Sequence, residues 1–242
     1  MSGQTEEGNL EEVLHSHGFS LPADQLTQLE RYRQLLWQWN ERLNLTRHLD
    51  LKTFVGRDVL DSLQLAHHLA PDERVLDIGT GGGVPGVILA IVRPDLKLSL
   101  CDSVGKKASA VTEMVEELRL PITVYAANAE QTLSEHEFDT CVARAVGPLW
   151  KILKWVQPHW SQVGRLLLIK GPKWAAERGE ARHRGYLSSL QLRRLASYRT
   201  PGHYGESVVL TIYPGGDDSP GRRSVAAPAA AKRGTGSGDA RG

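Results

Sequence analysis

The sequence has few of the residues that build metal centres and disulfide frameworks. Its 242 residues include two cysteines, two methionines and three phenylalanines. Cys101 and Cys141 stand in apolar, strand-like contexts, which predicts two buried free thiols in a reducing cytoplasm. The nine histidines are scattered along the chain and none clusters with a cysteine, so we expect no metal site.

Long apolar runs and an excess of one charge are also missing. No stretch has the length of a transmembrane helix, and the opening residues, MSGQTEEGNLEE, do not have the pattern of a signal peptide. Lysine and arginine total 29 against 28 acidic residues, a net charge of +1, so no overall positive field attracts nucleic acid. We expect a cytoplasmic protein without membrane contact, in which any basic surface is local.

One glycine-rich stretch organises the rest of the chain, and it reads RVLDIGTGGGVPG from Arg74 to Gly86. Its apolar start predicts a buried strand, and the glycines let the backbone turn sharply and approach a ligand. Pro85 suits the first turn of a helix, and residues 87–92 continue that helix until Pro94. Strand, glycine loop and helix form the opening unit of a nucleotide-binding α/β fold.

Two ligand patterns fit this loop. Gly81, Gly83 and Gly86 match the dinucleotide fingerprint G-x-G-x-x-G, whereas Asp77 followed by Gly79, Gly81 and Gly83 matches the D-x-G-x-G-x-G pattern of S-adenosylmethionine methyltransferases. A carboxylate repels a pyrophosphate at this position, but it can help to hold the cationic amino group of S-adenosylmethionine. Asp77 therefore favours the methyl donor, and a glycine turn without any ligand remains the alternative.

Asp102 ends the next predicted strand, 23 residues after Gly79. An acidic residue about 20 positions past the glycines is where a ribose diol is hydrogen-bonded. Asp102 therefore predicts an adenosine-type ligand, whether that ligand is a dinucleotide or the methyl donor. Its structural alternative is the N-cap of the helix that opens near Lys106.

The order of expected elements indicates a parallel sheet with helices on both faces and a closing antiparallel hairpin. Two helices, 25–43 and 51–69, form a cap before the sheet. The expected strands are 74–79, 96–102, 122–127, 138–143, 164–171, 190–199 and 208–213, and the helices between them are 87–92, 106–118, 148–155 and 173–188. We divide the chain into a helical cap at 1–70, whose first 20 or so residues are loosely ordered, a catalytic domain at 71–216 and a disordered tail at 217–242.

Several segments together resemble the RsmG (GidB) family of S-adenosylmethionine-dependent 16S rRNA (guanine-N7) methyltransferases. They are RVLDIGTGGGVPGVILAIVRPD, DSVGKK, FDTCVARA and LIKG, preceded by WNERLNLT and DSL, within about Asp24 to Tyr213. The resemblance implies a class I (Rossmann-like) methyltransferase fold with a seven-stranded, mostly parallel sheet and an antiparallel last strand. The implied substrate is 16S rRNA or a small-subunit particle, and we expect a monomer.

The resemblance also assigns a cofactor site. Gly79 and Val84 would line the methionine side of S-adenosylmethionine, Asp102 would hold the ribose, and Ala129 and Glu130 would edge the adenine. With Asp77, Gly81 and Gly83 from the loop pattern and with Arg144, these residues form the expected cofactor site of nine residues. The ends of predicted strands, where open α/β sheets bind ligands, carry Asp77, Asp102, Asn128, Arg144 and Lys170.

Arg144 is the expected catalytic residue. It matches the arginine of the family's SRA segment, which would lie beside the donor and the target base, and a structural salt bridge is its alternative role. Guanine N7 carries a lone pair and no proton, so alignment and exclusion of water are sufficient and no general base is expected. The chain lacks an N-P-P-Y-type motif after the fourth strand, and Cys141 is interpreted as a packed core thiol rather than a nucleophile.

RNA binding by a nearly neutral chain must depend on a few placed cations. The candidates are Arg31, Arg33, Arg42, Arg47, Lys106, Lys107, Arg144 and Lys170. Two positions depart from the family pattern, since Asp58 stands where a histidine is usual, and Glu206 and Ser207 stand where an arginine is usual. Three other functions remain open: a methyltransferase with another RNA or small-molecule acceptor, an NAD-dependent oxidoreductase, and a non-catalytic S-adenosylmethionine-sensing RNA-binding protein.

Overall fold

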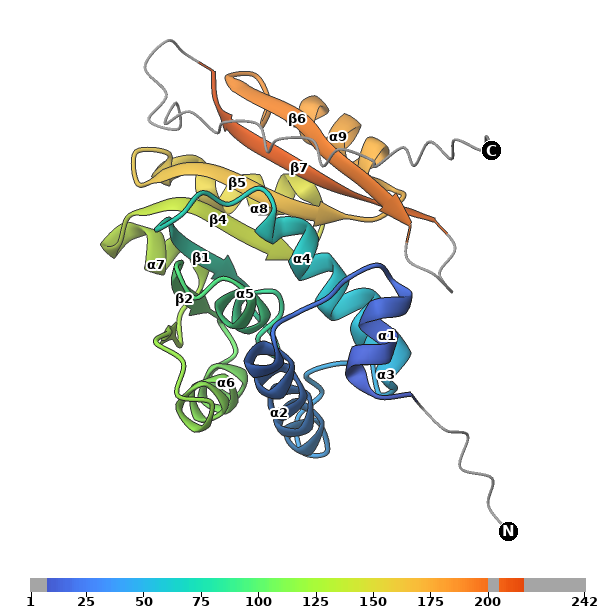
Figure 1. Cartoon of the computed structure of the whole chain (residues 1–242). Helices are drawn as coiled ribbons and strands as arrows, with labels where there is room; N and C mark the ends of the chain where they lie inside the picture. Colours follow the sequence, from blue (N-terminus) through green and yellow to red (C-terminus); the bar gives the residue numbers. More distant parts are fainter. Residues whose placement is uncertain (1–7, 200–204, 216–242) are drawn as a thin grey trace, which may run out of the picture.

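The computed structural model describes residues 8–199 and 205–215, so the tail expected at 217–242 lies outside the described residues. Its centre is a seven-stranded sheet with the strand order β3-β2-β1-β4-β5-β7-β6 (Figure 1). The strands are β1 Arg74–Ile78, β2 Lys97–Cys101, β3 Thr123–Tyr125, β4 Phe138–Arg144, β5 Val163–Lys170, β6 Leu190–Arg199 and β7 Glu206–Pro214.

The strand directions confirm the expected mostly parallel sheet. The pairs β1–β2, β1–β4, β2–β3 and β4–β5 are all parallel, whereas β7 runs antiparallel to both β5 and β6. After β1 the chain builds outward to β3 on one side and then returns to place β4 on the other side. Ligands of open α/β sheets bind at the carboxyl ends of the strands where the order reverses in this way.

Helices cover both faces of the sheet (Figure 1). One face carries α4 Leu60–Ala66, α5 Gly86–Val92 and α6 Gly105–Glu117, and the other carries α7 Ala129–Glu135, α8 Leu149–Val156 and α9 Trp174–His183. The apolar runs of β1, β4 and β5 are buried from both sides, because each strand contributes side chains to the clusters above and below the sheet.

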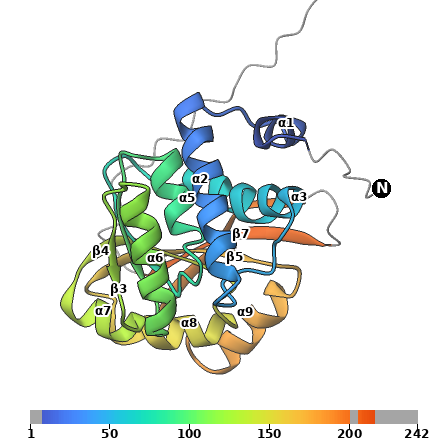
Figure 2. The same ribbon diagram turned by 90° about the horizontal axis from the view of Figure 1, so that it is seen from below.

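The N-terminal cap packs against the domain. It consists of α1 Leu10–Ser16, α2 Ala23–Asn40 and α3 Leu51–Thr53, and α3 continues through a π-helical segment, η1 Phe54–Val59, into α4. The helices α2, α5 and α6 lie side by side (Figure 2). Leu29, Tyr32 and Leu36 bury the inner face of α2 completely, so the apolar period that predicts this helix also marks its contact surface.

Two helices of the structure, α1 and α7, were not predicted from the sequence. Residues 10–16 were expected to be loosely ordered, but Leu10–Ser16 form α1, which buries three apolar side chains, Leu10, Val13 and Leu14. Helix α7 occupies a stretch for which no helix was expected. Both helices begin with a reciprocal capping box, Asn9 with Glu12 and Asn128 with Gln131, and this N-x-x-E/Q spacing is a sequence signal for a helix start.

Candidate active site

A cavity of about 650 Å³ opens at the carboxyl ends of β1, β2, β3 and β4. It lies where the sheet topology predicts a ligand site. Seven of the nine residues expected to bind the cofactor line this cavity: Gly79, Gly81, Val84, Asp102, Ala129, Glu130 and Arg144.

The first glycine of the loop cannot be replaced without moving a neighbour. Gly79 has φ +67°, in the left-handed region, and a Cβ atom built on it would lie 2.0 Å from Cγ1 of Val146. Gly81 also has a positive φ, +60°. The backbone of the loop therefore forms one wall of the cavity, and Val146 from the segment after β4 packs directly against it.

Asp77 lies beneath the loop and does not line the cavity. Its carboxylate is fully buried, and Oδ2 accepts hydrogen bonds from the Thr80 hydroxyl at 2.6 Å and the Gly86 amide at 3.0 Å. Oδ1 has no partner among the described residues. Burial raises the pKa of Asp77 to about 6, although these hydrogen bonds oppose the shift. Asp77 therefore acts by fixing the loop, and Gly83 likewise lies outside the cavity lining.

The cap helix α2 also touches the loop. Tyr32 is fully buried and its hydroxyl donates a hydrogen bond to the Gly82 carbonyl at 2.8 Å. A Cβ atom on Gly83, where φ is +102°, would approach the Tyr32 hydroxyl to 3.1 Å and the Val87 side chain to 2.7 Å. Gly83 thus permits close packing of loop, α2 and α5, and its role is structural support of the cavity wall.

The segment WNERLNLT also lines the cavity, a position that the sequence did not predict. Oδ1 of Asn40 accepts hydrogen bonds from the amides of Leu45 at 2.7 Å and Thr46 at 2.9 Å. This contact turns the chain after α2 so that Leu45 and Thr46, together with Leu36, line the cavity. The motif itself was visible in the sequence, but its position over the sheet depends on the packing of α2.

Asp102 connects the end of β2 to the glycine loop. It is 7% exposed, and its two oxygens accept hydrogen bonds from the Gly81 amide at 2.9 Å and the Val104 amide at 2.8 Å. The N-cap position of α6 belongs to Val104, whose side chain makes no capping bond, so the N-cap alternative for Asp102 does not hold. Each carboxylate oxygen retains a second lone pair that can accept a ribose hydroxyl.

The residues after β3 form the rim of the cavity. Asn128 caps α7 by accepting a hydrogen bond from the Gln131 amide at 2.9 Å. The cap places Ala129, which is buried, and Glu130, which is exposed, in the first turn of the helix. Both line the cavity.

Arg144 ends β4 with its guanidinium between two buried carboxylates. Nη2 lies 2.7 Å from Oδ1 of Asp58 and Nη1 lies 3.4 Å from Oδ2 of Asp61. Burial disfavours the charge on Arg144, but Asp58 and Asp61 outweigh this effect, and the pKa of Arg144 is raised above its ordinary value. The chain then turns through Ala145, a non-glycine residue with φ +56°. Arg144 thus has the salt bridges considered as its alternative role, and it also lines the cavity.

The two carboxylates belong to a wider network. Oδ1 of Asp58 also lies 2.8 Å from Nδ1 of His48, and Oδ1 of Asp61 accepts a hydrogen bond of 2.6 Å from the Tyr198 hydroxyl. Asp58, which departs from the family pattern, is therefore in direct contact with Arg144, the expected catalytic residue. Ser207, at the second departure, pairs across the hairpin with Tyr198. Sequence analysis did not anticipate these contacts.

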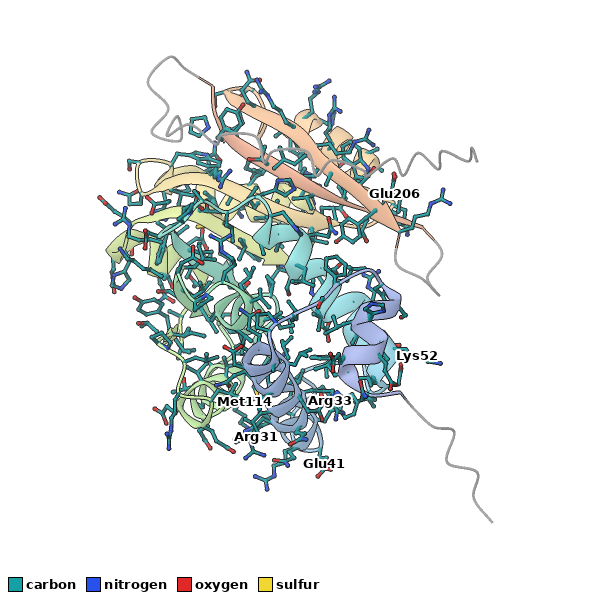
Figure 3. The ribbon with its side chains drawn as sticks, viewed as in Figure 1. Arg31, Arg33, Glu41, Lys52, Met114 and Glu206 are labelled. Atoms are coloured by element: carbon teal, nitrogen blue, oxygen red, sulfur yellow. The ribbon has the colours of Figure 1, made fainter. Side chains whose placement is uncertain are left out.

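The candidate cations differ in availability. Lys170 is buried, and its ammonium group donates a hydrogen bond to the Gly147 carbonyl and forms an ion pair with Glu177. It is therefore not free to contact RNA. Arg31 pairs with Glu117, and Arg33 pairs with Glu30 and lies over the Trp37 ring. Arg31 and Arg33 project from α2, far from the start of β7 that Glu206 marks (Figure 3). Three cationic side chains line the cavity: Lys107, Arg144 and Lys151.

Neither cysteine is placed for nucleophilic chemistry. Cys141 is fully buried and outside the cavity lining, and burial raises its pKa well above the ordinary value. Cys101 reaches the cavity, but burial raises its pKa to about 11. Within residues 8–199 and 205–215, no group of three or more potential ligands is arranged to hold a metal ion. No helix in these ranges is long and apolar enough to cross a bilayer.

The sheet order and the cavity define a class I methyltransferase fold. A mutant of MtNAS in complex with S-adenosylmethionine superposes with a TM-score of 0.52 and 13% identity, covering 85% of this chain and 77% of that one. This likeness shows the fold alone. The expected fold class, with its antiparallel β7, is confirmed.

Sequence comparison gives the family. The family model for rRNA small subunit methyltransferase G matches residues 25–203. The ribosomal RNA small subunit methyltransferase G of Rhodopirellula baltica is 53% identical over 186 residues, 77% of this chain and 80% of that protein. Its namesake from Chlorobaculum tepidum is 35% identical over 188 residues, 75% of this chain and 87% of that protein. The chain belongs to the rRNA small subunit methyltransferase G family. Family membership confirms the expected enzyme class and cofactor, a methyltransferase that uses S-adenosylmethionine, which decides against the oxidoreductase alternative.

Proposed function

We propose that this chain methylates N7 of a guanine in 16S rRNA, as a cytoplasmic monomer that acts on free rRNA or on the small-subunit particle. Family membership supports the reaction class and the RNA substrate. The observation that carries the choice of atom is Arg144, which closes the cavity beside the glycine loop and offers hydrogen-bond donors but no base.

The cavity residues fit the methyl donor. Asp102 offers a nearly buried carboxylate to a ribose, and the backbone at Gly79 and Gly81 has no side chain between it and the cavity. The remaining cofactor contacts proposed are Val84 on the methionine side, and Ala129 and Glu130 at the adenine. When bound, S-adenosylmethionine supplies an electrophilic methyl group on a sulfonium.

The task of the protein is then to align an acceptor and exclude water. Guanine N7 has a free lone pair, so no side chain has to remove a proton. The carboxylates that line the cavity fit this requirement, because Asp102 is engaged by two backbone amides and Glu130 lies exposed at the rim. Leu36, Leu45 and Trp155 add apolar surface that can exclude water from the reacting atoms.

Arg144 also offers a way to select the base. Its buried Nε–H has no hydrogen-bond partner among the described residues, and a buried donor without a partner is costly. Guanine presents the acceptor O6 next to N7, whereas adenine presents an amino donor at that position. Nε–H has almost no accessible surface in this conformation, so we infer that the Arg144 side chain rotates when RNA binds and that O6 of the target guanine then satisfies this donor.

The test uses the purified protein, methyl-labelled S-adenosylmethionine and rRNA from cells that lack the gene. Borohydride reduction and aniline cleavage break an RNA chain at N7-methylguanosine, so a labelled 16S rRNA should be cut at one position. Label in 16S rRNA without such a cut would show another acceptor atom. Label in a small molecule or another RNA would favour the alternative acceptors.

A further inference from the structure

Tyr198 connects the outer edge of the sheet to the arginine of the cavity. It belongs to β6, the last strand of the sheet (Figure 1), and it does not line the cavity. Its hydroxyl nevertheless donates a hydrogen bond of 2.6 Å to Oδ1 of Asp61 in α4. Asp61 is fully buried, and its other oxygen, Oδ2, faces Nη1 of Arg144 at 3.4 Å.

A β-bulge gives Tyr198 this direction. Leu190 and Leu192 pack against the cluster formed with α8 and α9, on one face of the sheet, whereas Ala196 and Tyr198 pack against the cluster formed with α4 and α5, on the other. Strict alternation would put all four on the same face. The pairing register with β7 shifts between Arg194 and Ala196, so Leu195 is the extra residue, and the side chains after it change face.

The extra residue leaves a visible trace in the strand. Leu195 is 39% exposed, one of the few large apolar side chains that the described residues leave in solvent. The exposed Leu195 side chain contributes little packing. Its insertion into the strand, however, turns the following side chains, so that the Tyr198 hydroxyl reaches a buried carboxylate. The bulge therefore brings the Tyr198 hydroxyl to Asp61 and also places Ala196 and the Tyr198 ring against the cluster of α4 and α5.

Asp61 needs the donors that face it. Burial raises the pKa of Asp61, and Arg144 from β4, Tyr198 from β6 and Arg57 from η1 each oppose this shift. The pKa of Tyr198 is itself far above the ordinary value because of burial and the nearby Asp61, so its hydroxyl keeps its proton and remains a donor. Asp58, with the His48 ring against it, completes the polar surroundings of Arg144.

We propose that Tyr198 is a positioning residue for methyl transfer: it fixes one oxygen of Asp61, so that the other oxygen holds the Arg144 guanidinium at the cavity wall. The proposal rests on the proposed function, which gives Arg144 its place beside the reacting base. The terminal hairpin thereby has a direct effect on the active site, through two side chains.

The first experiment removes only the hydroxyl. In Tyr198→Phe the ring can keep its packing, and we expect kcat at saturating S-adenosylmethionine and RNA to fall about tenfold, because a small misplacement of a catalytic group has effects of this size. The KM for S-adenosylmethionine should stay within twofold. Tyr213→Phe on β7 is the matched control, because the Arg193 guanidinium lies over the Tyr213 ring and does not need the hydroxyl, and its kcat should not change.

The second experiment asks whether Tyr198 acts through Arg144. If it does, Tyr198→Phe changes kcat less than twofold in an Arg144→Lys background, since coupled residues are not additive. The same loss in both backgrounds would overturn the proposal. If Arg144→Lys is too slow to measure, the pH profile decides: the acid limb of kcat should move to higher pH in Tyr198→Phe, and an unmoved limb overturns the proposal. Wild-type kcat in both Arg144→Lys and Arg144→Ala would instead refute the role of Arg144 in the proposed function.

Discussion

Two walls of the cavity are built in different ways. The cofactor wall is loop 79–83, which Asp77 and Asp102 hold in place through contacts that are close in sequence. Asp77 binds residues 3 and 9 positions away, and Asp102 binds residues 2 and 21 positions away. The arginine wall is Arg144, which Asp58, Asp61 and Tyr198 hold from behind the cavity lining. The contacts of Asp61 in this group join residues 83 and 137 positions apart. The first wall is local and the second is assembled by the whole fold.

This difference predicts how each wall fails. A change in the cofactor wall disturbs one loop, so it should alter the binding of the methyl donor or, at the buried Asp77, the stability, without a direct effect on turnover. A change in the arginine wall leaves a buried charged side chain without its partner between η1, α4, β4 and β6. Such a change should therefore affect folding and turnover together.

The largest effect is expected from Arg144→Ala. It leaves Asp58 and Asp61 buried without their cation, which should lower the free energy of unfolding by about 3–5 kcal/mol. Removing a donor beside the reacting base should also lower kcat by about 100-fold or more. Urea denaturation and single-turnover kinetics at saturating RNA and donor measure the two effects.

A matched variant separates stability from chemistry. Arg144→Met combined with Asp58→Asn and Asp61→Asn removes the stranded charges, so most of the lost stability should return while kcat stays low. A variant Arg144→Ala that unfolds more easily but keeps full kcat would show that Arg144 is only a structural ion pair. The residue would then have to leave the proposed active site.

The next effect belongs to the cofactor wall and depends on pH. The pKa of Asp77 is raised from 3.8 to about 6 by burial, so the folded state binds a proton that the unfolded state has released. Its stabilising contribution is therefore present below about pH 4 and is lost as the pH rises through about 6. The raised pKa corresponds to about 3 kcal/mol.

Asp77→Asn should remove this pH dependence, because the amide does not titrate yet keeps an acceptor for Thr80 and Gly86. The free energy of unfolding of both proteins should be measured by urea denaturation from pH 4 to pH 7.5. Relative to wild type, the variant should become more stable as the pH rises. Parallel curves for the two proteins would contradict the buried, loop-fixing role of Asp77.

The same contrast explains what the sequence revealed. Strands, the glycine loop and Asp102 were predictable, because apolar runs and short-range spacing determine them. Helices α1 and α7 were not predicted, although Asn9 and Asn128 mark their starts. A capping residue is a weak signal in a segment whose composition is mostly polar. Tyr198 was not predictable, because its direction depends on a bulge at Leu195 and on the position of α4. Local chemistry therefore indicated the glycine loop and Asp102, whereas only the fold revealed what surrounds Arg144.

A smaller effect is expected from Asp102→Ala. The variant removes the carboxylate acceptor proposed for the ribose, and it frees the Gly81 and Val104 amides. Binding of S-adenosylmethionine should weaken by about 1–3 kcal/mol, measured by calorimetry, while RNA affinity should stay unchanged. Glu130→Ala is the control at the exposed rim, and it should weaken binding less. An equal or larger loss for Glu130→Ala would mean that the ribose contact has been assigned to the wrong carboxylate.

The smallest effect tests which cations outside both walls meet the RNA. Arg47 is exposed, directly follows Thr46 at the cavity, and has no carboxylate partner among the described residues. Arg31 is occupied by Glu117, so it is a matched control with the same charge. Arg47→Ala should reduce the slope of log K against log salt by about one unit, the value for one lost phosphate contact, and turnover at saturating RNA should be preserved. Arg31→Ala should change the slope less, because its charge is already compensated.

Anisotropy titrations of a 16S rRNA fragment at several salt concentrations measure both slopes. Equal slopes for the two variants would show that RNA does not approach the cavity along the segment after α2.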